Sequence, residues 1–161
     1  MKKLVILFVM GLAIPQIAQT QGTTYLSSLS QSSTSSLPVA SDYWLAAEFG
    51  TGPDASGYLL NSIQLGMTGA SGNPNSFTVL IYSAIVGASV NPGSSLGTLN
   101  GSLNPVTGNI YTYTPASNLT LSPNTDYFIV LTSGTPVANG ASGWSESAYP
   151  PDTSDGWKVD N

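Results

Sequence analysis

Two glutamates, Glu48 and Glu146, are the residues whose type could carry out acid–base chemistry in this chain. Glycoside hydrolysis needs a pair of carboxyl groups about 5–10 Å apart, one as the acid and one as nucleophile or base. The sequence therefore allows a glycosidase that uses Glu48 and Glu146, provided that the fold brings them together. Two solvated carboxylates on separate segments are the simpler interpretation, and we favour it.

Acidic side chains also gather near the end of the chain, in the segment DTSDG at residues 152–156. Hard cations such as calcium prefer oxygen ligands, which carboxylates and hydroxyls supply. Asp152 and Asp155 are therefore candidate calcium ligands. Their spacing does not match an EF-hand loop, and Asp-Gly is common in ordinary turns. We expect a plain turn and no cofactor, with calcium as the alternative.

Aromatic side chains suggest a third kind of site. Trp144, Tyr149 and Trp157 lie late in the chain among loop-forming residues, while Trp44 lies in a strand-like segment. Their rings could stack on the C–H faces of sugars. Aromatic residues in strands more often pack in the core or pair across strands. Trp144, Trp157 and Tyr149 are the candidate ligand-binding residues, with core packing as the alternative.

The chain has no histidine, cysteine or arginine, and its basic side chains are Lys2, Lys3 and Lys158. Most catalysis near neutral pH uses a group that titrates there, a thiolate, or a strong cation. Because these groups are missing, we expect a protein that is not an enzyme and has no catalytic residues.

Residues 1–22 have the layout of a secretory signal peptide. Lys2 and Lys3 precede the apolar run LVILFVMGLAI, and Pro15 ends it. This run is too short to cross a bilayer, which needs about 20 apolar residues. We expect residues 1–22 to be cleaved, and the mature protein to be secreted, extracellular or at the cell surface, without a membrane span.

Removal of residues 1–22 leaves one basic and eight acidic side chains, so the formal charge becomes −7. A chain of this sign has no set of cations to neutralise phosphates, so we expect no binding to nucleic acid. About 140 residues remain, a length at which one domain can bury its own core without disulfides.

The candidate residues must be positioned by strands, because no segment after the signal peptide shows a sustained helical period. Alternating or apolar segments recur about every 10 residues, separated by Gly, Pro, Asn and Ser. They span residues 43–50, 58–68, 76–83, 110–114 and 126–132. Such a pattern predicts an all-β fold, which we interpret as an antiparallel two-sheet β-sandwich of jelly-roll type.

Smaller signals complete the expected organisation. The Ser/Thr-rich residues 23–41 read as a leader, and the sandwich domain is expected to span residues 42–161. Asn100-Gly101 predicts a tight hairpin, because type I′ turns need positive φ at both central residues. Residues 126–132 are apolar on both faces, which indicates an interior strand.

Five segments after residue 40 form an ordered series of strand and turn motifs. They are residues 47–52, 57–63, 77–82, 91–99 and 119–131. The series resembles the choice-of-anchor R domain of bacterial exported proteins. That resemblance implies a β-fold in an exported bacterial protein without an established catalytic role. It also implies a further closing strand and a sorting tail of the PEP-CTERM type. Residues 1–161 contain neither of these features.

Three functions remain open on these observations. The favoured one is a non-enzymatic surface or extracellular-matrix module of structural or adhesive type, with weak polar contacts to polysaccharide or to a surface protein. The second is a carbohydrate-binding module with an aromatic contact face that includes Trp144 and Trp157. The third is the glycosidase that uses Glu48 and Glu146.

Overall fold

The structure, a computed structural model, describes residues 22–106, 108–147 and 151–159, and these residues form strands and turns without a helix. The expected all-β fold is confirmed. Within the described ranges, no helix is long and apolar enough to span a membrane. The strands are β1 (Leu26–Ser27), β2 (Ser33–Val39), β3 (Leu45–Gly50), β4 (Tyr58–Leu59), β5 (Ile63–Gly72), β6 (Thr78–Val86), β7 (Val90–Asn100), β8 (Ile110–Pro115), β9 (Thr120–Leu121), β10 (Asp126–Thr132), β11 (Gly140–Ser147) and β12 (Asp152–Thr153).

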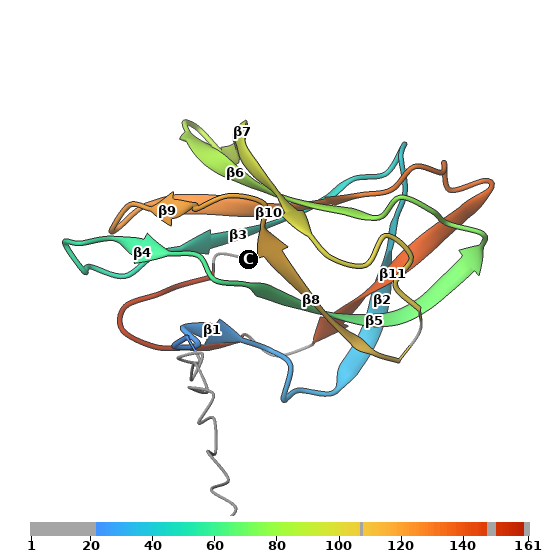
Figure 1. Cartoon of the computed structure of the whole chain (residues 1–161), viewed down its shortest axis with the longest axis horizontal. Coiled ribbons are helices and arrows are strands. Elements are labelled where there is room, and N and C mark those ends of the chain that lie inside the picture. The colour runs from blue at the N-terminus through green and yellow to red at the C-terminus, as the bar shows by residue number, and fades with distance from the viewer. Residues whose placement is uncertain (1–21, 107, 148–150, 160–161) are drawn as a thin grey trace, which may run out of the picture.

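Eight strands form one large, nearly closed antiparallel sheet in the order β2-β11-β5-β8-β7-β6-β10-β3 (Figure 1). Its edge strands β2 and β3 are consecutive in the chain and are separated only by residues 40–44. This short connection requires the sheet to curl until its two edges approach each other. Two small antiparallel sheets, β1-β12 and β4-β9, lie outside the large one.

The large sheet consists of two halves, β2-β11-β5-β8 and β7-β6-β10-β3. They are joined where Leu99 and Asn100 of β7 pair with Pro115 and Thr114 of β8. The sequence predicted two separate sheets, whereas hydrogen bonds between β7 and β8 connect all eight strands described here. Because this ladder is so short, the halves can face each other across the core.

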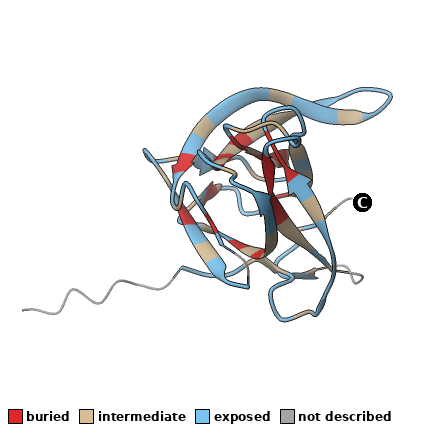
Figure 2. Ribbon diagram, turned by 90° about the vertical axis from the view of Figure 1, so that its right-hand side faces the viewer, coloured by how far each residue is buried: buried red, intermediate tan, exposed pale blue. Residues whose placement is uncertain are grey.

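The core lies inside the curled sheet and contains buried residues from both halves, which are red in Figure 2. Alternate residues of each strand point inward, as the period of two requires. Strand β10 is buried on both faces, and its bounds agree with the predicted interior strand. The core residues from these strands are Val39, Phe49, Leu65, Met67, Val79, Ile81, Leu99, Tyr113, Tyr127 and Leu131.

The Ser/Thr-rich segment at residues 23–41, expected to precede the domain, supplies β1 and β2. Strand β2 pairs with β11 along its length, from Ser33 to Val39. Leu37 is half-buried and Val39 fully buried, while the serines and threonines of β2 face solvent. Two inward apolar side chains on alternate positions are therefore enough to recruit this polar segment to the sheet edge.

The hairpin predicted at Asn100-Gly101 is wrong. Residues 101–109 separate β7 from β8, and Gly101 is not among the glycines with positive φ. A Cβ at Gly101 would lie 2.2 Å from Cδ1 of Tyr113, so the glycine permits close packing of a buried ring. The short hairpin is instead β6–β7, which turns at residues 87–89.

Candidate functional site

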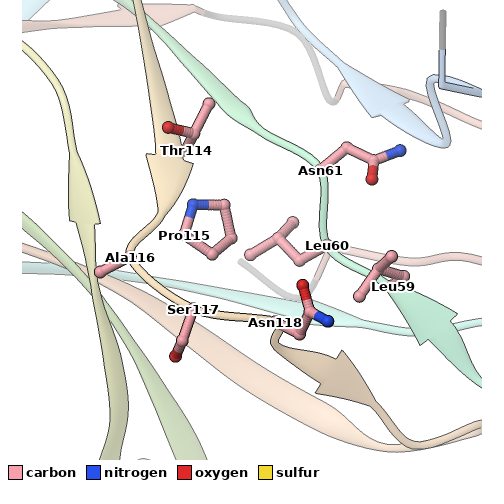
Figure 3. A pocket seen from close by; sticks show the side chains of 8 residues that line it. All are labelled: Leu59, Leu60, Asn61, Thr114, Pro115, Ala116, Ser117 and Asn118. Carbon is pink, nitrogen blue, oxygen red and sulfur yellow. The ribbon is translucent and has the colours of Figure 1, made fainter. Parts of the chain in front are cut away.

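A cleft of about 300 Å³ opens between residues 59–61, at the end of β4 and just after it, and residues 114–118, at the end of β8 and in the connection to β9 (Figure 3). Strand β4 pairs with β9, which holds the two walls together. The Leu60 N–H donates to the Leu119 carbonyl at 2.9 Å, and the Ala116 N–H donates to the Thr98 carbonyl at 3.2 Å. We call this feature the Asn61–Asn118 cleft.

The lining of the Asn61–Asn118 cleft contains no charged group. Its polar side chains are two amides and two hydroxyls, and the rest of the lining is aliphatic or proline. Amides donate and accept hydrogen bonds at once, and hydroxyls do the same. Such a set matches ligands that carry many hydroxyl groups and no charge. The polar lining residues are Asn61, Asn118, Thr114 and Ser117.

The cleft belongs to a wider uncharged region. Residues 55–125 contain no Asp, Glu, Lys or Arg, and they include the adjacent strands β5, β8, β7 and β6. Hydroxyl and amide side chains face solvent along these strands. Gln64 on β5, for example, donates to Thr112 on β8 at 3.3 Å. The middle of the large sheet is therefore neutral, and the acidic groups lie on the flanking strands and connections.

A second hollow, of about 360 Å³, is lined by Tyr25, Pro53, Asp54, Tyr58 and Asp155. The Ser56 hydroxyl and N–H donate to the Asp54 carboxylate at 2.6 and 2.9 Å. These bonds, the hydroxyl bond foremost, lower the pKa of Asp54 below its ordinary value. Asp155 adopts positive φ at 51° in the turn before Trp157. The hollow thus combines aromatic walls with carboxylates.

Trp157 lies in a cluster of aromatic rings on the core. Its indole stacks on Tyr25 and on Phe49, with 5.0 and 5.9 Å between ring centroids. Tyr58 meets the indole edge-on at 5.0 Å. Because three protein rings pack against Trp157, the indole is part of the core packing rather than a free surface for a sugar.

Trp144 and Trp44, both in the described part of the chain, make no ring contact with this cluster. Trp144 is half-buried on β11, where it pairs with Leu37 on β2 and Met67 on β5 and packs on the core. Tyr149 lies outside the described residues. Trp44 is the tryptophan that solvent reaches most, at 56% exposure, and its Nε1–H donates to the Ser41 carbonyl. Trp144 and Trp157 therefore face the core rather than a shared outer surface.

The two glutamates lie on strands that do not pair with each other. Glu48 is on edge strand β3, which pairs with β10, and Glu146 is on β11, which pairs with β2 and β5. Phe49 points into the core, so the adjacent Glu48 points away from it. Glu146 is exposed and accepts a hydrogen bond from the Ser35 hydroxyl.

Asp152 and Asp155 are both exposed, and Asp152 pairs with Ser27 in the short β1-β12 sheet. In the part of the chain that the structure describes, no three His, Cys, Asp or Glu side chains lie close enough to hold a metal ion. Asp54 lines the same hollow as Asp155, but among the described residues these carboxylates do not form such a group of three.

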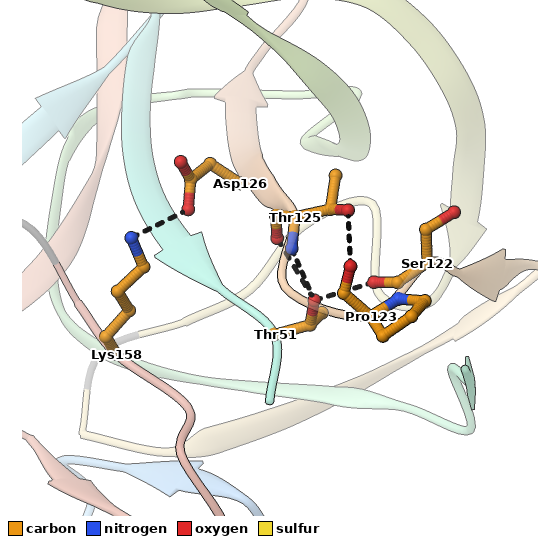
Figure 4. A network of polar contacts seen from close by, with 6 residues as sticks. All are labelled: Thr51, Ser122, Pro123, Thr125, Asp126 and Lys158. Atoms are coloured by element: carbon orange, nitrogen blue, oxygen red, sulfur yellow. Dashed lines mark hydrogen bonds and ion pairs between the residues drawn. The ribbon is translucent and has the colours of Figure 1, made fainter. Parts of the chain in front are cut away.

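Residues of the family-like segments meet in a polar network that sequence reasoning did not single out (Figure 4). The Thr51 hydroxyl donates to the Ser122 carbonyl at 2.6 Å and accepts from the Thr125 N–H at 3.0 Å. Beside it, Lys158 pairs with Asp126 at 3.2 Å and exchanges backbone hydrogen bonds with Gly50. These contacts join the end of β3 to the turn before β10, so the motif residues have a structural role.

Comparisons with protein families, curated proteins and solved structures found no match to this chain. The resemblance to the choice-of-anchor R domain therefore rests on the sequence segments themselves.

Proposed function

We propose that this chain is a non-enzymatic, exported module of adhesive type that holds uncharged polysaccharide in the Asn61–Asn118 cleft. The observation that carries the proposal is the neutral lining of that cleft within a neutral sheet. Amides and hydroxyls can replace the water that binds sugar hydroxyls, and aliphatic groups can contact the C–H faces of a sugar. A polyanionic polysaccharide would find no positively charged side chain in this lining to neutralise its charge.

Several features favour binding over turnover. The chain contains no histidine, cysteine or arginine, and the two glutamates lie on strands β3 and β11, which do not pair with each other. A glycosidase would need its two carboxyl groups on either side of one glycosidic bond. Neither glutamate lines the Asn61–Asn118 cleft. The cleft is open and polar, and the pairing of β4 with β9 holds its two sides together. Such a cleft is suited to weak, repeated contacts along a polymer.

The location and finer architecture belong to the same proposal. We take residues 1–22 as a removable signal peptide that directs the chain to the cell surface or extracellular matrix of a bacterium. The two halves of the curled sheet would act as the layers of a jelly-roll-like sandwich, which the short β7–β8 ladder supports. The meeting of the family-like segments at Thr51 and Thr125 supports membership of the choice-of-anchor R family.

Affinity electrophoresis of the full chain tests this function. The gels contain an uncharged polysaccharide, such as xyloglucan or dextran, or the polyanion alginate as the charged comparison. We expect retardation by an uncharged polymer and none by alginate. Each lost amide contact weakens binding by about 1 kcal/mol, so the double variant Asn61→Ala/Asn118→Ala should bind roughly thirtyfold more weakly.

Asn139→Ala provides the matched control, because Asn139 is an exposed asparagine between β10 and β11, outside the cleft. It should bind as the unchanged chain does. Equal retardation of the double variant would remove the cleft from the proposal. If no neutral polysaccharide in a representative panel slows the migration of the unchanged chain, adhesion to such polymers is overturned. If the chain releases reducing sugar from a polysaccharide, the non-enzymatic role is overturned.

A further inference from the structure

The outer part of the β6–β7 hairpin, residues 84–94, leaves the large sheet as a free arm. Strand β10 pairs with β6 only as far as Ser83, and β8 pairs with β7 only at Leu99 and Asn100. Beyond those points the two strands of the hairpin pair only with each other, among the described residues. Figure 2 shows this arm at the top, where it reaches well beyond the body of the molecule.

Register shifts at the base of the arm explain why it leaves the sheet. They lie between Ile81 and Tyr82 and between Tyr82 and Ala84, whereas the three outer pairs from Ala84 to Val86 are regular. A β-bulge bends its strand and increases the local twist, which carries the arm away from β10 and β8. The bulges thus present a regular two-stranded ribbon to solvent.

The tip of the arm is apolar and uncharged. Ile85 is 60% exposed and Val86 is 73% exposed, the largest exposed fraction among the large hydrophobic residues. No Asp, Glu, Lys or Arg occurs in residues 84–94. Branched apolar side chains at the end of a projecting ribbon lose contact with water only when another molecule covers them.

The two edges of the arm differ in their capacity to pair with another strand. Exposed edges are normally blocked by lysine, proline or bulges, because their free N–H and C=O groups otherwise recruit a further strand. The β7 edge contains Pro92, which lacks an N–H. The β6 edge, residues 84–86, carries neither proline nor charge. This edge is open to an added strand.

We propose that this open edge binds the same edge of a second copy of the chain, so that two arms form a four-stranded antiparallel ribbon. Antiparallel pairing of one edge with itself is self-complementary about a twofold axis. Ile85 would lie opposite its own copy, with Val86 beside it. The rest of the surface has a net negative charge, so an uncharged element is where two copies can meet without repulsion.

The contact is short, so the dimer is a weak one that forms at high local concentration. Three residues on each edge bury less than the roughly 1,200 Å² that stable interfaces reach. Adhesive surface modules are crowded, and weak contacts add up when many copies lie on one surface. Self-association of the arm is independent of polysaccharide binding in the Asn61–Asn118 cleft.

Sedimentation velocity of the full chain over a wide concentration range tests the proposal. The average mass should rise toward that of a dimer as concentration increases. Ile85→Lys places a charge opposite its own copy and should raise the dissociation constant at least roughly tenfold. Val137→Lys is the matched control, since Val137 is an exposed apolar residue outside the arm, and it should dimerise as the unchanged chain does.

A second measurement uses the absence of cysteine from the chain. Ile85→Cys introduces a single thiol next to the twofold axis, where paired strands bring Cβ atoms within disulfide range. Oxidation should cross-link this variant at least roughly tenfold faster than Val137→Cys. Equal cross-linking rates, or a dimer that Ile85→Lys leaves intact, would overturn the proposal. If the chain stays monomeric but floats with phosphatidylcholine vesicles, and Ile85→Lys abolishes that flotation, the arm binds a lipid surface. That result would also overturn the proposed dimer.

Discussion

The indole of Trp157 lies parallel to the ring of Tyr25, with 5.0 Å between their centroids and 9° between their planes. Phe49 of β3 also stacks on the indole, with 5.9 Å between ring centroids and 3° between planes. Tyr25 immediately precedes β1, and Trp157 follows β12, so the stack joins both ends of the described chain to the core. This position gives Trp157 a role in stability.

Trp157→Ala should therefore lower the free energy of unfolding by about 3 kcal/mol, because it removes a large ring from a packed cluster. Urea unfolding followed by circular dichroism measures the change. Trp44→Ala is the control, since Trp44 is exposed, and it should change stability by no more than about 0.5 kcal/mol. Similar losses for the two variants would contradict the structural role of the ring stack.

The sequence predicts the strands of this fold better than their connections. Strand β10 is recognisable because it is apolar on both faces, and β8 because it is rich in β-branched and aromatic residues. Strand β7 has no such signal, since Pro92, Gly93 and several serines interrupt it. Its place between β6 and β8 depends on tertiary pairing, which a local pattern does not contain.

The candidate cleft was missed because residues 58–68 look like one strand. In the structure, residues 60–62 interrupt the segment and separate β4 from β5. The polar pair Asn61-Ser62, between Leu60 and Ile63, was the signal in the sequence that could have revealed this interruption. The opposite wall at residues 114–118 meets them only because β4 pairs with β9. Trp144 and Trp157 were recognisable as candidates by residue type alone. Whether their rings are buried or exposed depends on long-range packing, which the local sequence does not contain.

The hydroxyl of Thr51 is the centre of a buried network, and its removal should be costly. Thr51 is 2% exposed, donates to the Ser122 carbonyl and accepts from the Thr125 N–H. Thr51→Val keeps the shape of the side chain but leaves both backbone groups without this partner. We expect a loss of about 2–3 kcal/mol in the free energy of unfolding, measured in urea.

Thr51→Ser distinguishes the contribution of the Thr51 hydroxyl to stability from that of its methyl group. The serine variant retains both hydrogen bonds and loses only a methyl group, so it should lose about 1 kcal/mol. If serine and valine at this position destabilise the protein equally, the methyl packing rather than the network holds β3 to the turn at residues 122–125.

Gly101→Ala should destabilise the protein, because its new methyl group would lie 2.2 Å from the buried ring of Tyr113. Displacement of that ring from a packed core costs about 2 kcal/mol. Gly97→Ala, on β7 four residues earlier, is the control, since no atom lies within 4 Å of its added Cβ. Thermal unfolding should show a lower midpoint for Gly101→Ala and an unchanged or higher one for Gly97→Ala. A reversed order would contradict the close packing of Tyr113 on Gly101.

The stability of the protein should fall in strong alkali because of Tyr113. Burial, with a smaller contribution from Tyr111, raises the pKa of Tyr113 from 10.0 to about 12. Its O–H donates to the Ser102 carbonyl at 3.0 Å. Between pH 10 and pH 12 the unfolded chain loses this proton while the folded chain retains it. Ionisation therefore favours the unfolded state, and the contribution present below pH 10 is lost as the pH rises to about 12.

Tyr113→Phe isolates this contribution, because the two proteins differ only in the phenol at this position. Loss of the bond to Ser102 should lower the free energy of unfolding at neutral pH by about 1 kcal/mol. Urea unfolding from about pH 9 to pH 12 should then show a shallower fall with pH for Tyr113→Phe than for the unchanged chain. The two curves should converge or cross toward pH 12, where the unchanged chain must ionise a buried phenol in order to remain folded. Parallel curves over that range would show that Tyr113 has the same pKa in the folded and unfolded states.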